Sequence, residues 1–190
     1  MKLTMKILVV AVLCLFSRTF AQDEMAACLI KPLRVGQRMP EIILDKIHNY
    51  TTTRSDLGDM VLKFMIIELW SAKSSSCVAN YRRIEDLACN NEYDVRFIRI
   101  TSESQAEVLS FLLRHPPKVP SWIPLVTDDH LLNGFFPHMQ AQQYVWIDRT
   151  GKIVAITGPE DVTEDNIDLA FNQRPISKSA IIAAIPTNIQ

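Results

Sequence analysis

The residues best suited to chemistry lie in a short serine-rich stretch that ends at a cysteine. Ser74, Ser75 and Ser76 stand directly before Cys77, between an apolar run and an amphipathic one. Serine side chains in such a turn can cap the following helix, whose first amides point outward. Cys77 falls in the first helical turn, where the helix dipole favours a thiolate. This is therefore the one place in the chain where the residue types make chemistry plausible.

Two elements must hold this thiol in place. Val61–Trp70 is rich in large apolar residues and contains neither glycine nor proline, which predicts a buried strand. Val78–Cys89 carries apolar residues at helical spacing, which predicts an amphipathic helix. The buried stripe of this helix is expected to hold Cys77, Tyr81, Ile84, Leu87 and Ala88.

The amino terminus has the layout of a secretory signal. A basic start, a short apolar core and a small-residue site at Ala21 predict a signal peptide over residues 1–21. This segment holds three basic and no acidic side chains, so the remaining 169 residues carry 17 basic and 21 acidic ones, a net charge of −4. A mildly acidic domain is a poor candidate for binding nucleic acid or an anionic membrane surface. No later segment is long and apolar enough to span a membrane.

Three cysteines follow the predicted signal, an odd number for an exported protein. Cys77 and Cys89 are twelve residues apart on one expected helix, a rise of about 18 Å that excludes a disulfide between them. Cys28 can in principle reach either partner, and the alternative is three unbonded thiols. The cysteines and histidines show no metal-ligand spacing, so neither a metal nor another cofactor is expected.

The rest of the chain alternates between strand-like and helix-like patterns, after a lead-in segment at residues 22–32. The tail at 173–190 has no clear pattern, so whether it is ordered stays open. Parallel strands with a crossover helix, followed by an antiparallel hairpin, predict an α/β fold. The expected elements are a strand at 41–47, a polar loop at 48–58, a strand at 94–101, a helix at 103–114 capped by Thr101 or Ser102 with the apolar stripe Ala106, Leu109, Leu112 and Leu113, an edge piece at 123–127, a helical turn at 128–134, hairpin strands at 144–148 and 153–157, and a last helix opened by Thr163.

At this point the sequence resembles the exported thioredoxin-like proteins of the TlpA/ResA type over roughly residues 33–171. The resemblance rests on Val35–Pro40, on Glu68-Leu-Trp70 before the serines, and on the stretch Val145–Val154, which is like a Trp-Ile-Asp-x-x-Gly-x-Val hairpin. It implies a thioredoxin-like domain over residues 33–172, with a central mixed sheet flanked by helices.

The resemblance also implies a degenerate active site. The family motif Trp-Cys-x-x-Cys aligns with Lys73–Cys77, so Ser74 replaces the attacking cysteine and Cys77 matches the resolving one. Glu68 matches the buried acid that helps to move the thiol proton, although it could equally be a remnant or a strand end turned toward solvent. The family's cis-proline loop aligns with Ala141 and Gln142, so the proline is lost.

The function predicted from these residues is a binding or folding-assistance role in the bacterial periplasm or cell envelope. A hydroxyl forms no disulfide, so the dithiol cycle cannot close at Ser74. The resemblance also implies that Cys77 is shielded, because the second position of the motif is normally covered. The alternative is an active monothiol oxidoreductase or peroxidase that uses Cys77. The expected partners are protein or peptide thiols and disulfides, and the chain is expected to be a monomer. Trp70, Trp122 and Trp146 either wall a peptide groove or belong to the core.

Overall fold

The computed structural model describes residues 30–90, 95–116, 123–137 and 142–172. The chain divides into two units, Met1–Pro32 and Leu33–Gln190, and every described helix and strand belongs to the second. The predicted signal peptide, nearly all of the lead-in segment and the carboxyl-terminal tail lie outside the described residues. Ala141, Cys28 and Trp122 also lie outside them, so the predictions for these residues stay predictions.

The order of elements within the described ranges follows the expected alternation. None of the helices in these ranges has both the length and the apolar character needed to cross a bilayer. The elements are β1 (Ile43–Asp45), β2 (Ile47–His48), β3 (Arg54–Asp56), the 3-10 helix η1 (Gly58–Met60), β4 (Phe64–Leu69), α2 (Ser75–Asn90), β5 (Val95–Ile100), α3 (Gln105–Arg114), β6 (Leu125–Val126), α4 (Leu131–Phe135), β7 (Gln143–Asp148), β8 (Ile153–Thr157), the 3-10 helix η2 (Pro159–Asp161) and α5 (Glu164–Phe171).

A six-stranded mixed sheet in the order β2-β6-β5-β4-β7-β8 forms the centre of the second unit. β4 runs parallel to β5, which is parallel to β6, whereas β7 pairs antiparallel with both β4 and β8. The predicted crossover and hairpin are therefore confirmed. All six residues of β4 are buried, as expected for a central strand covered on both faces. β1 and β3 form a separate two-stranded sheet.

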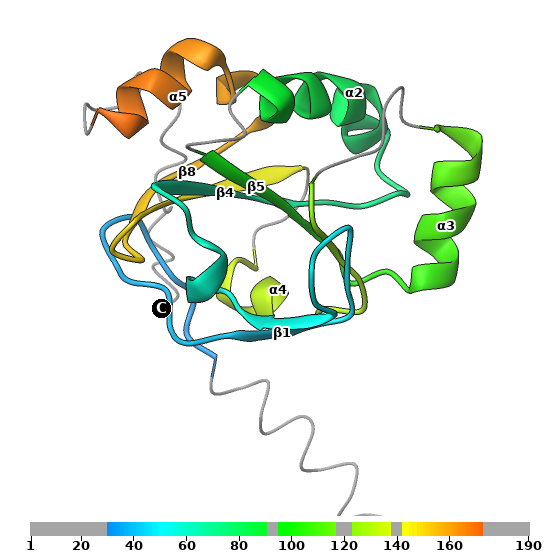
Figure 1. Ribbon diagram of the computed structural model, residues 1–190, viewed down its shortest axis with the longest axis horizontal. Helices are drawn as coiled ribbons and strands as arrows, with labels where there is room; N and C mark the ends of the chain where they lie inside the picture. The colour runs from blue at the N-terminus through cyan, green and yellow to red at the C-terminus, as the bar shows by residue number, and fades with distance from the viewer. Residues whose placement is uncertain (1–29, 91–94, 117–122, 138–141, 173–190) are drawn as a thin grey trace, which may run out of the picture. The chain divides into compact units, whose positions relative to one another are not determined.

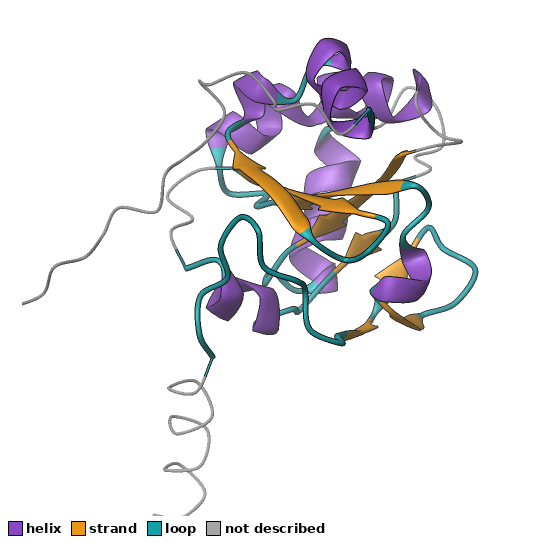
Figure 2. Cartoon of the chain, turned by 90° about the vertical axis from the view of Figure 1, so that its left-hand side faces the viewer, coloured by secondary structure: helices purple, strands orange, loops and turns teal. Residues whose placement is uncertain are grey.

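Helices cover one face of the sheet and smaller elements cover the other. Figure 1 shows α2 and α5 on one side of β4, with α4 and β1 on the opposite side, and Figure 2 shows the same layers from the side. Successive side chains of β4 point to opposite faces of the sheet, so the strand contributes to one hydrophobic cluster on each face. Phe64 and Ile66 pack toward α2 and α5, whereas Met65, Ile67 and Leu69 pack in the cluster that includes residues of β1, η1 and α4.

Three predictions for the connecting segments are wrong in detail. The single strand expected at 41–47 is two strands, because Lys46 has a φ of 54° and interrupts the extended backbone. The expected loop at 48–58 contains β3, which pairs with β1. The edge piece expected at 123–127 is β6, an internal strand between β2 and β5.

The helix α3 exists as expected but buries a different face. It begins after Ser104, whose side chain accepts a hydrogen bond from the Glu107 amide in a reciprocal capping box, so the predicted caps at Thr101 and Ser102 are wrong. Val108 and Phe111 are buried, whereas Leu113 is 84% exposed. Of the predicted apolar stripe, Ala106, Leu109 and Leu113 are exposed and Leu112 is partly buried. The helix has apolar residues on two faces, so periodicity alone did not identify the buried one.

The hairpin and the last helix follow the sequence closely. Gly151 has a φ of 78°, a conformation that glycine adopts readily, in the turn between β7 and β8. Thr163 caps α5 by accepting a hydrogen bond from the Asn166 amide at 3.2 Å. Both features agree with the predicted turn and helix start.

Candidate functional site

Cys77 lies in the first turn of α2 and is enclosed, both as expected. Its side chain is 1% exposed and belongs to a cluster between α2, α3 and the sheet. The buried neighbours in this cluster are Trp70, Tyr81, Val108, Phe111 and Leu125. A reagent or a partner thiol would have to displace part of this cluster to reach the sulfur atom.

The electrostatic surroundings of Cys77 oppose ionisation. Burial raises the pKa of the thiol above its ordinary value. Hydrogen bonds from the Ser71 backbone and the Ser74 side chain lower it in part, whereas the Glu68 and Glu103 carboxylates raise it further. Loss of solvation is the largest of these effects and outweighs the favourable hydrogen bonds at the helix start.

Ser74 directly precedes α2, and Ser75 and Ser76 are its first two residues. The hydroxyl groups of Ser74 and Ser76 lie 2.9 Å apart, and the Val78 amide donates to the Ser74 carbonyl at 3.1 Å. Ser74 is partly exposed and Ser75 is exposed. Ser74 therefore stands directly before α2, and its side chain is hydrogen-bonded to the Cys77 thiol. The match of these two positions to a redox motif stays a prediction.

The buried carboxylate of Glu103 is hydrogen-bonded to the two residues Ser71 and Ala72, shortly before these serines. The Glu103 carboxylate accepts hydrogen bonds from the Ser71 hydroxyl at 2.6 Å and from the Ala72 amide at 2.8 Å. Closer to the surface, the Lys73 ammonium group forms an ion pair with the Glu107 carboxylate of α3 at 2.7 Å. The turn is therefore bound to the segment that precedes α3 and to α3 itself, which limits how far it can open.

Glu68 is buried and fully engaged by neighbouring side chains. It is 1% exposed and accepts hydrogen bonds from Arg99 Nε at 2.7 Å, from the Tyr144 hydroxyl at 2.9 Å and from the Gln142 amide group. Strand register explains two of these partners, because Glu68 lies opposite Arg99 on β5 and Tyr144 on β7. The interpretation of Glu68 as a solvent-facing strand end is therefore wrong.

Arg99 is the site residue that sequence reasoning missed. It is 2% exposed and, besides Glu68, it donates to Glu85 at 3.3 Å and to the Tyr81 carbonyl at 2.9 Å. Its guanidinium carbon lies 4.0 Å from the centre of the Tyr81 ring. Burial alone lowers its pKa, but the Glu68 and Glu85 carboxylates outweigh that effect and raise the pKa of Arg99 above the ordinary value. The sequence held a signal for this pair, because one apolar strand contains the acidic Glu68 and the next contains the basic Arg99. Charged side chains on buried strands need partners of opposite charge.

Gln142 contributes to the site by a different route from the one expected. It precedes β7, is 3% exposed, and uses its side-chain amide to donate to Glu68. Its own side-chain oxygen is buried without a partner in the described part of the chain. Gln142 thus completes the polar cluster around Glu68.

The other thiol that the structure describes, Cys89, differs from Cys77 in its exposure to solvent. Cys89 lies near the end of α2, is exposed, and forms no disulfide, and neither does Cys77. Within the described ranges no three histidine, cysteine or acidic side chains are grouped as a metal ion would need. Of the three tryptophans, Trp70 and Trp146 are 2% and 0% exposed and belong to the core.

Comparison with known proteins finds similarity in three-dimensional structure. No protein-family model and no curated protein matches the sequence. Among solved structures, a candidate thiol:disulfide interchange protein DsbE from Chlorobium tepidum matches with a TM-score of 0.54 and 14% identity, over 65% of this chain and 84% of that one. A candidate protein disulfide isomerase from Bacteroides thetaiotaomicron matches with a TM-score of 0.57 and 20% identity, over 74% and 87%.

A candidate thioredoxin from Neisseria meningitidis is also similar, with a TM-score of 0.58 and 15% identity over 73% of this chain and 92% of that one. These identities are too low to carry function from one chain to the other, but the shared architecture extends over most of each protein. The mixed sheet, the strand–turn–helix that carries Cys77 and the late hairpin agree with it. The chain therefore has a thioredoxin-like fold.

Proposed function

We propose that this chain is an exported relative of the TlpA/ResA-type thiol-disulfide oxidoreductases that has lost dithiol chemistry. It acts as a binding or folding-assistance module in the cell envelope. The export follows from the signal-like residues 1–21, and the loss of chemistry follows first from Ser74, whose hydroxyl cannot form the disulfide of a dithiol cycle.

The engagement of Glu68 carries the proposal. An acid that shuttles the proton of a thiol must exchange hydrogen-bond partners during each cycle. Both oxygens of Glu68 already accept hydrogen bonds from fixed donors on β5, on β7 and at Gln142. One of these donors is the cationic Arg99, and separating a buried ion pair is costly. Glu68 thus supports the fold in a position where an active relative needs a mobile proton carrier.

The condition of Cys77 bears on the alternative, in which this thiol itself is the attacking group. It is buried, and its pKa is raised, whereas an attacking thiol is normally accessible and acidic. These two observations therefore weigh against the monothiol oxidoreductase or peroxidase.

Insulin reduction with dithiothreitol as the electron donor tests the proposal. The chain without residues 1–21 should reduce insulin at the rate of dithiothreitol alone. A dithiol thioredoxin assayed beside it shows that the assay reports activity. Turnover comparable to that of the dithiol protein would refute the proposed loss of dithiol chemistry.

A further inference from the structure

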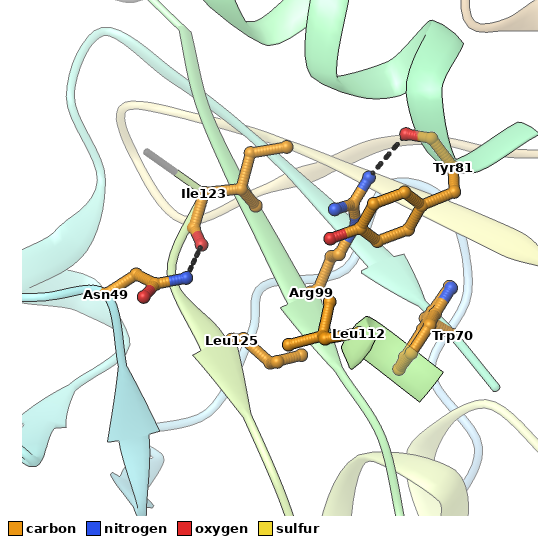
Figure 3. A pocket seen from close by; sticks show the side chains of 7 residues that line it. All are labelled: Asn49, Trp70, Tyr81, Arg99, Leu112, Ile123 and Leu125. Atoms are coloured by element: carbon orange, nitrogen blue, oxygen red, sulfur yellow. Dashed lines mark hydrogen bonds between the residues drawn. The ribbon is translucent and has the colours of Figure 1, made fainter. Parts of the chain in front are cut away.

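The cavity between α2, α3 and the sheet is small, and the polar groups around it are bonded to one another. Its volume is about 150 Å³. Figure 3 shows the Arg99 side chain beside the Tyr81 ring, with a hydrogen bond from Arg99 to the Tyr81 carbonyl. Arg99 also donates to Glu68 and Glu85, and Tyr81 is hydrogen-bonded to Glu85. The charged surface of the same unit offers a partner more than this interior does.

Two neighbouring turns carry four basic residues on that surface. The first turn spans residues 34–37, and its last amide donates to the carbonyl of its first residue at 3.1 Å. The second spans residues 148–151, between β7 and β8, and is closed in the same way at 2.9 Å. Figure 1 shows the first segment, in blue, beside the turn between β7 and β8 and away from α3. The basic residues of the two turns and the positions directly after them, here called the basic patch, are all exposed: Arg34, Arg38, Arg149 and Lys152.

Hydrogen bonds hold the two turns together. The Gly36 amide donates to the Ile153 carbonyl at 2.8 Å, and the Ile153 amide donates to the Gln37 carbonyl at 2.8 Å. The Arg38 guanidinium adds a hydrogen bond from Nη1 to the Thr150 carbonyl at 2.6 Å. The backbone positions of the basic patch are therefore fixed in the folded chain.

The arrangement places like charges side by side. Arg38 and Lys152 stand opposite each other in an antiparallel bridge, and like charges at directly opposed positions repel each other. Among the described residues, none of the ion pairs includes a member of the basic patch. Asp148 interacts with Lys152, but one of its oxygens already accepts hydrogen bonds from the amide and hydroxyl of Thr150. An external anion would relieve the repulsion that remains.

The basic patch is a local exception to the charge of the domain. Residues 22–190 carry a net charge of −4, which predicts poor binding to an anionic membrane surface. Residues 34–41 and 148–152 together hold four basic and two acidic side chains, a net charge of +2. Exposed charges act over about 8 Å at physiological ionic strength. A surface that meets the two turns therefore senses the basic patch rather than the average of the domain.

The layout of the basic patch suits an extended anionic surface. Its side chains are exposed and spread over two turns, whereas recognition of a single anion usually relies on donors that converge on it. Val35 is 41% exposed in the first turn, next to Arg34. An apolar side chain among cations suits the boundary between lipid headgroups and acyl chains. An acidic protein segment would supply the negative charge but no such boundary.

We propose that the basic patch binds the anionic headgroups of a phospholipid membrane, with Val35 entering the headgroup layer. Each lysine or arginine near such a surface strengthens binding about fivefold. The contact holds the proposed binding module against a membrane of the cell envelope. It uses none of Ser74, Cys77 and Glu68, so it stands or falls independently of the proposed loss of dithiol chemistry.

Sedimentation with lipid vesicles tests the proposal. The chain without residues 1–21 is used, because it keeps every described helix and strand and lacks the apolar segment that would itself enter a bilayer. It should bind vesicles that contain phosphatidylglycerol and not vesicles of phosphatidylcholine alone. The binding should be lost between about 0.01 M and about 1 M salt, since the screening length falls from about 30 Å to about 3 Å. Equal binding to both kinds of vesicle, or no binding to either, overturns the proposal.

Two double variants of equal charge test the location. Arg149→Gln with Lys152→Gln removes two charges from the basic patch, whereas Arg82→Gln with Arg114→Gln removes two from exposed positions on α2 and α3. Both lower the net charge by the same amount. The first should bind anionic vesicles about 25-fold more weakly, and the second should stay within about twofold of the unaltered chain. Equal midpoints of urea unfolding show that both variants are folded. Equal losses of binding overturn the proposed surface.

A soluble polyanion separates a membrane from an acidic protein segment. Poly-glutamate at the same concentration of charge should displace the chain from anionic vesicles poorly, because it offers no boundary for Val35. Inorganic phosphate at matched ionic strength should act no differently from sodium chloride. Tighter binding to poly-glutamate than to anionic vesicles, or specific competition by phosphate, overturns the assignment to a membrane surface.

Discussion

Replacing Arg99 with methionine should destabilise the protein far more than a typical substitution on the same strand. Arg99→Met keeps an unbranched side chain but removes the cation between Glu68 and Glu85, which are 1% and 8% exposed. It also removes the donor to the Tyr81 carbonyl. Breaking a buried ion pair from one side costs about 3–5 kcal/mol, because the remaining charge stays buried without a partner. That is a large part of the 5–15 kcal/mol by which a domain is typically stable.

Urea unfolding of the chain without residues 1–21 measures this effect. The transition midpoint should fall while the slope stays constant, since both variants expose a similar surface on unfolding. Arg96→Met is the matched control, because Arg96 lies on the same strand, is partly exposed, and contacts the Tyr50 ring at 5.6 Å. Its loss should cost about 1 kcal/mol or less.

A double variant separates the charge from the packing. Glu68→Gln added to Arg99→Met removes one unpaired charge and leaves an amide oxygen that can still accept from Tyr144. It should recover at least about 1 kcal/mol of the lost stability. If Arg99→Met costs no more than Arg96→Met, the ion pair does not stabilise the fold, and the structural role assigned to Glu68 is refuted.

Three further predictions concern the elements around the motif. Phe111→Ala should cost about 3–5 kcal/mol and Leu113→Ala less than about 0.5 kcal/mol in urea unfolding, because the first residue is buried and the second is 84% exposed; equal costs would contradict the observed orientation of α3. Hydrogen bonds from Lys73 and Ser104 lower the pKa of Glu107 to about 2 from 4.5, so its contribution to stability is present above about pH 4.5 and is lost as the pH falls toward 2. The stability difference between the unaltered chain and Glu107→Gln should therefore shrink between about pH 6 and about pH 3, and a constant difference would exclude this contribution. Ser74→Cys should allow a disulfide with Cys77 under oxidised glutathione, seen as a loss of two hydrogens by mass spectrometry, and should raise insulin reduction above that of the unaltered chain; no disulfide would contradict the alignment of the motif.

The fold was predictable because its strongest signals are long and regular. Val61–Trp70 is apolar throughout, and the structure makes it the central strand β4. The turn at Gly151 and the cap at Thr163 each contain the residue type that the local geometry requires. The outer elements were less predictable, since β3 has little apolar character and is defined by its pairing with β1.

The position of the site and the shielding of Cys77 were predictable, but the partners of Glu68 were not. The sequence placed Ser74 and Cys77 at a helix start and placed an acid on the strand before it. The helix dipole is a local effect, whereas the burial of Cys77 depends on Phe111 and Leu125, which are distant in sequence. In the same way, the partner of Glu68 depends on strand register, which brings Arg99 beside it from 31 residues away. Tertiary packing therefore decides whether the motif is reactive.

Alkylation of Cys77 by iodoacetamide, followed against pH with peptide mapping, tests the central claim most directly. Cys89 is the internal comparison, because it is exposed on the same helix. At every pH at which Cys89 is labelled in the folded chain, Cys77 should be labelled at least about a hundredfold more slowly. The two rates should become similar in a concentration of urea that unfolds the chain. Labelling of Cys77 in the folded chain as fast as Cys89, or at neutral pH, would contradict a shielded and redox-inactive site.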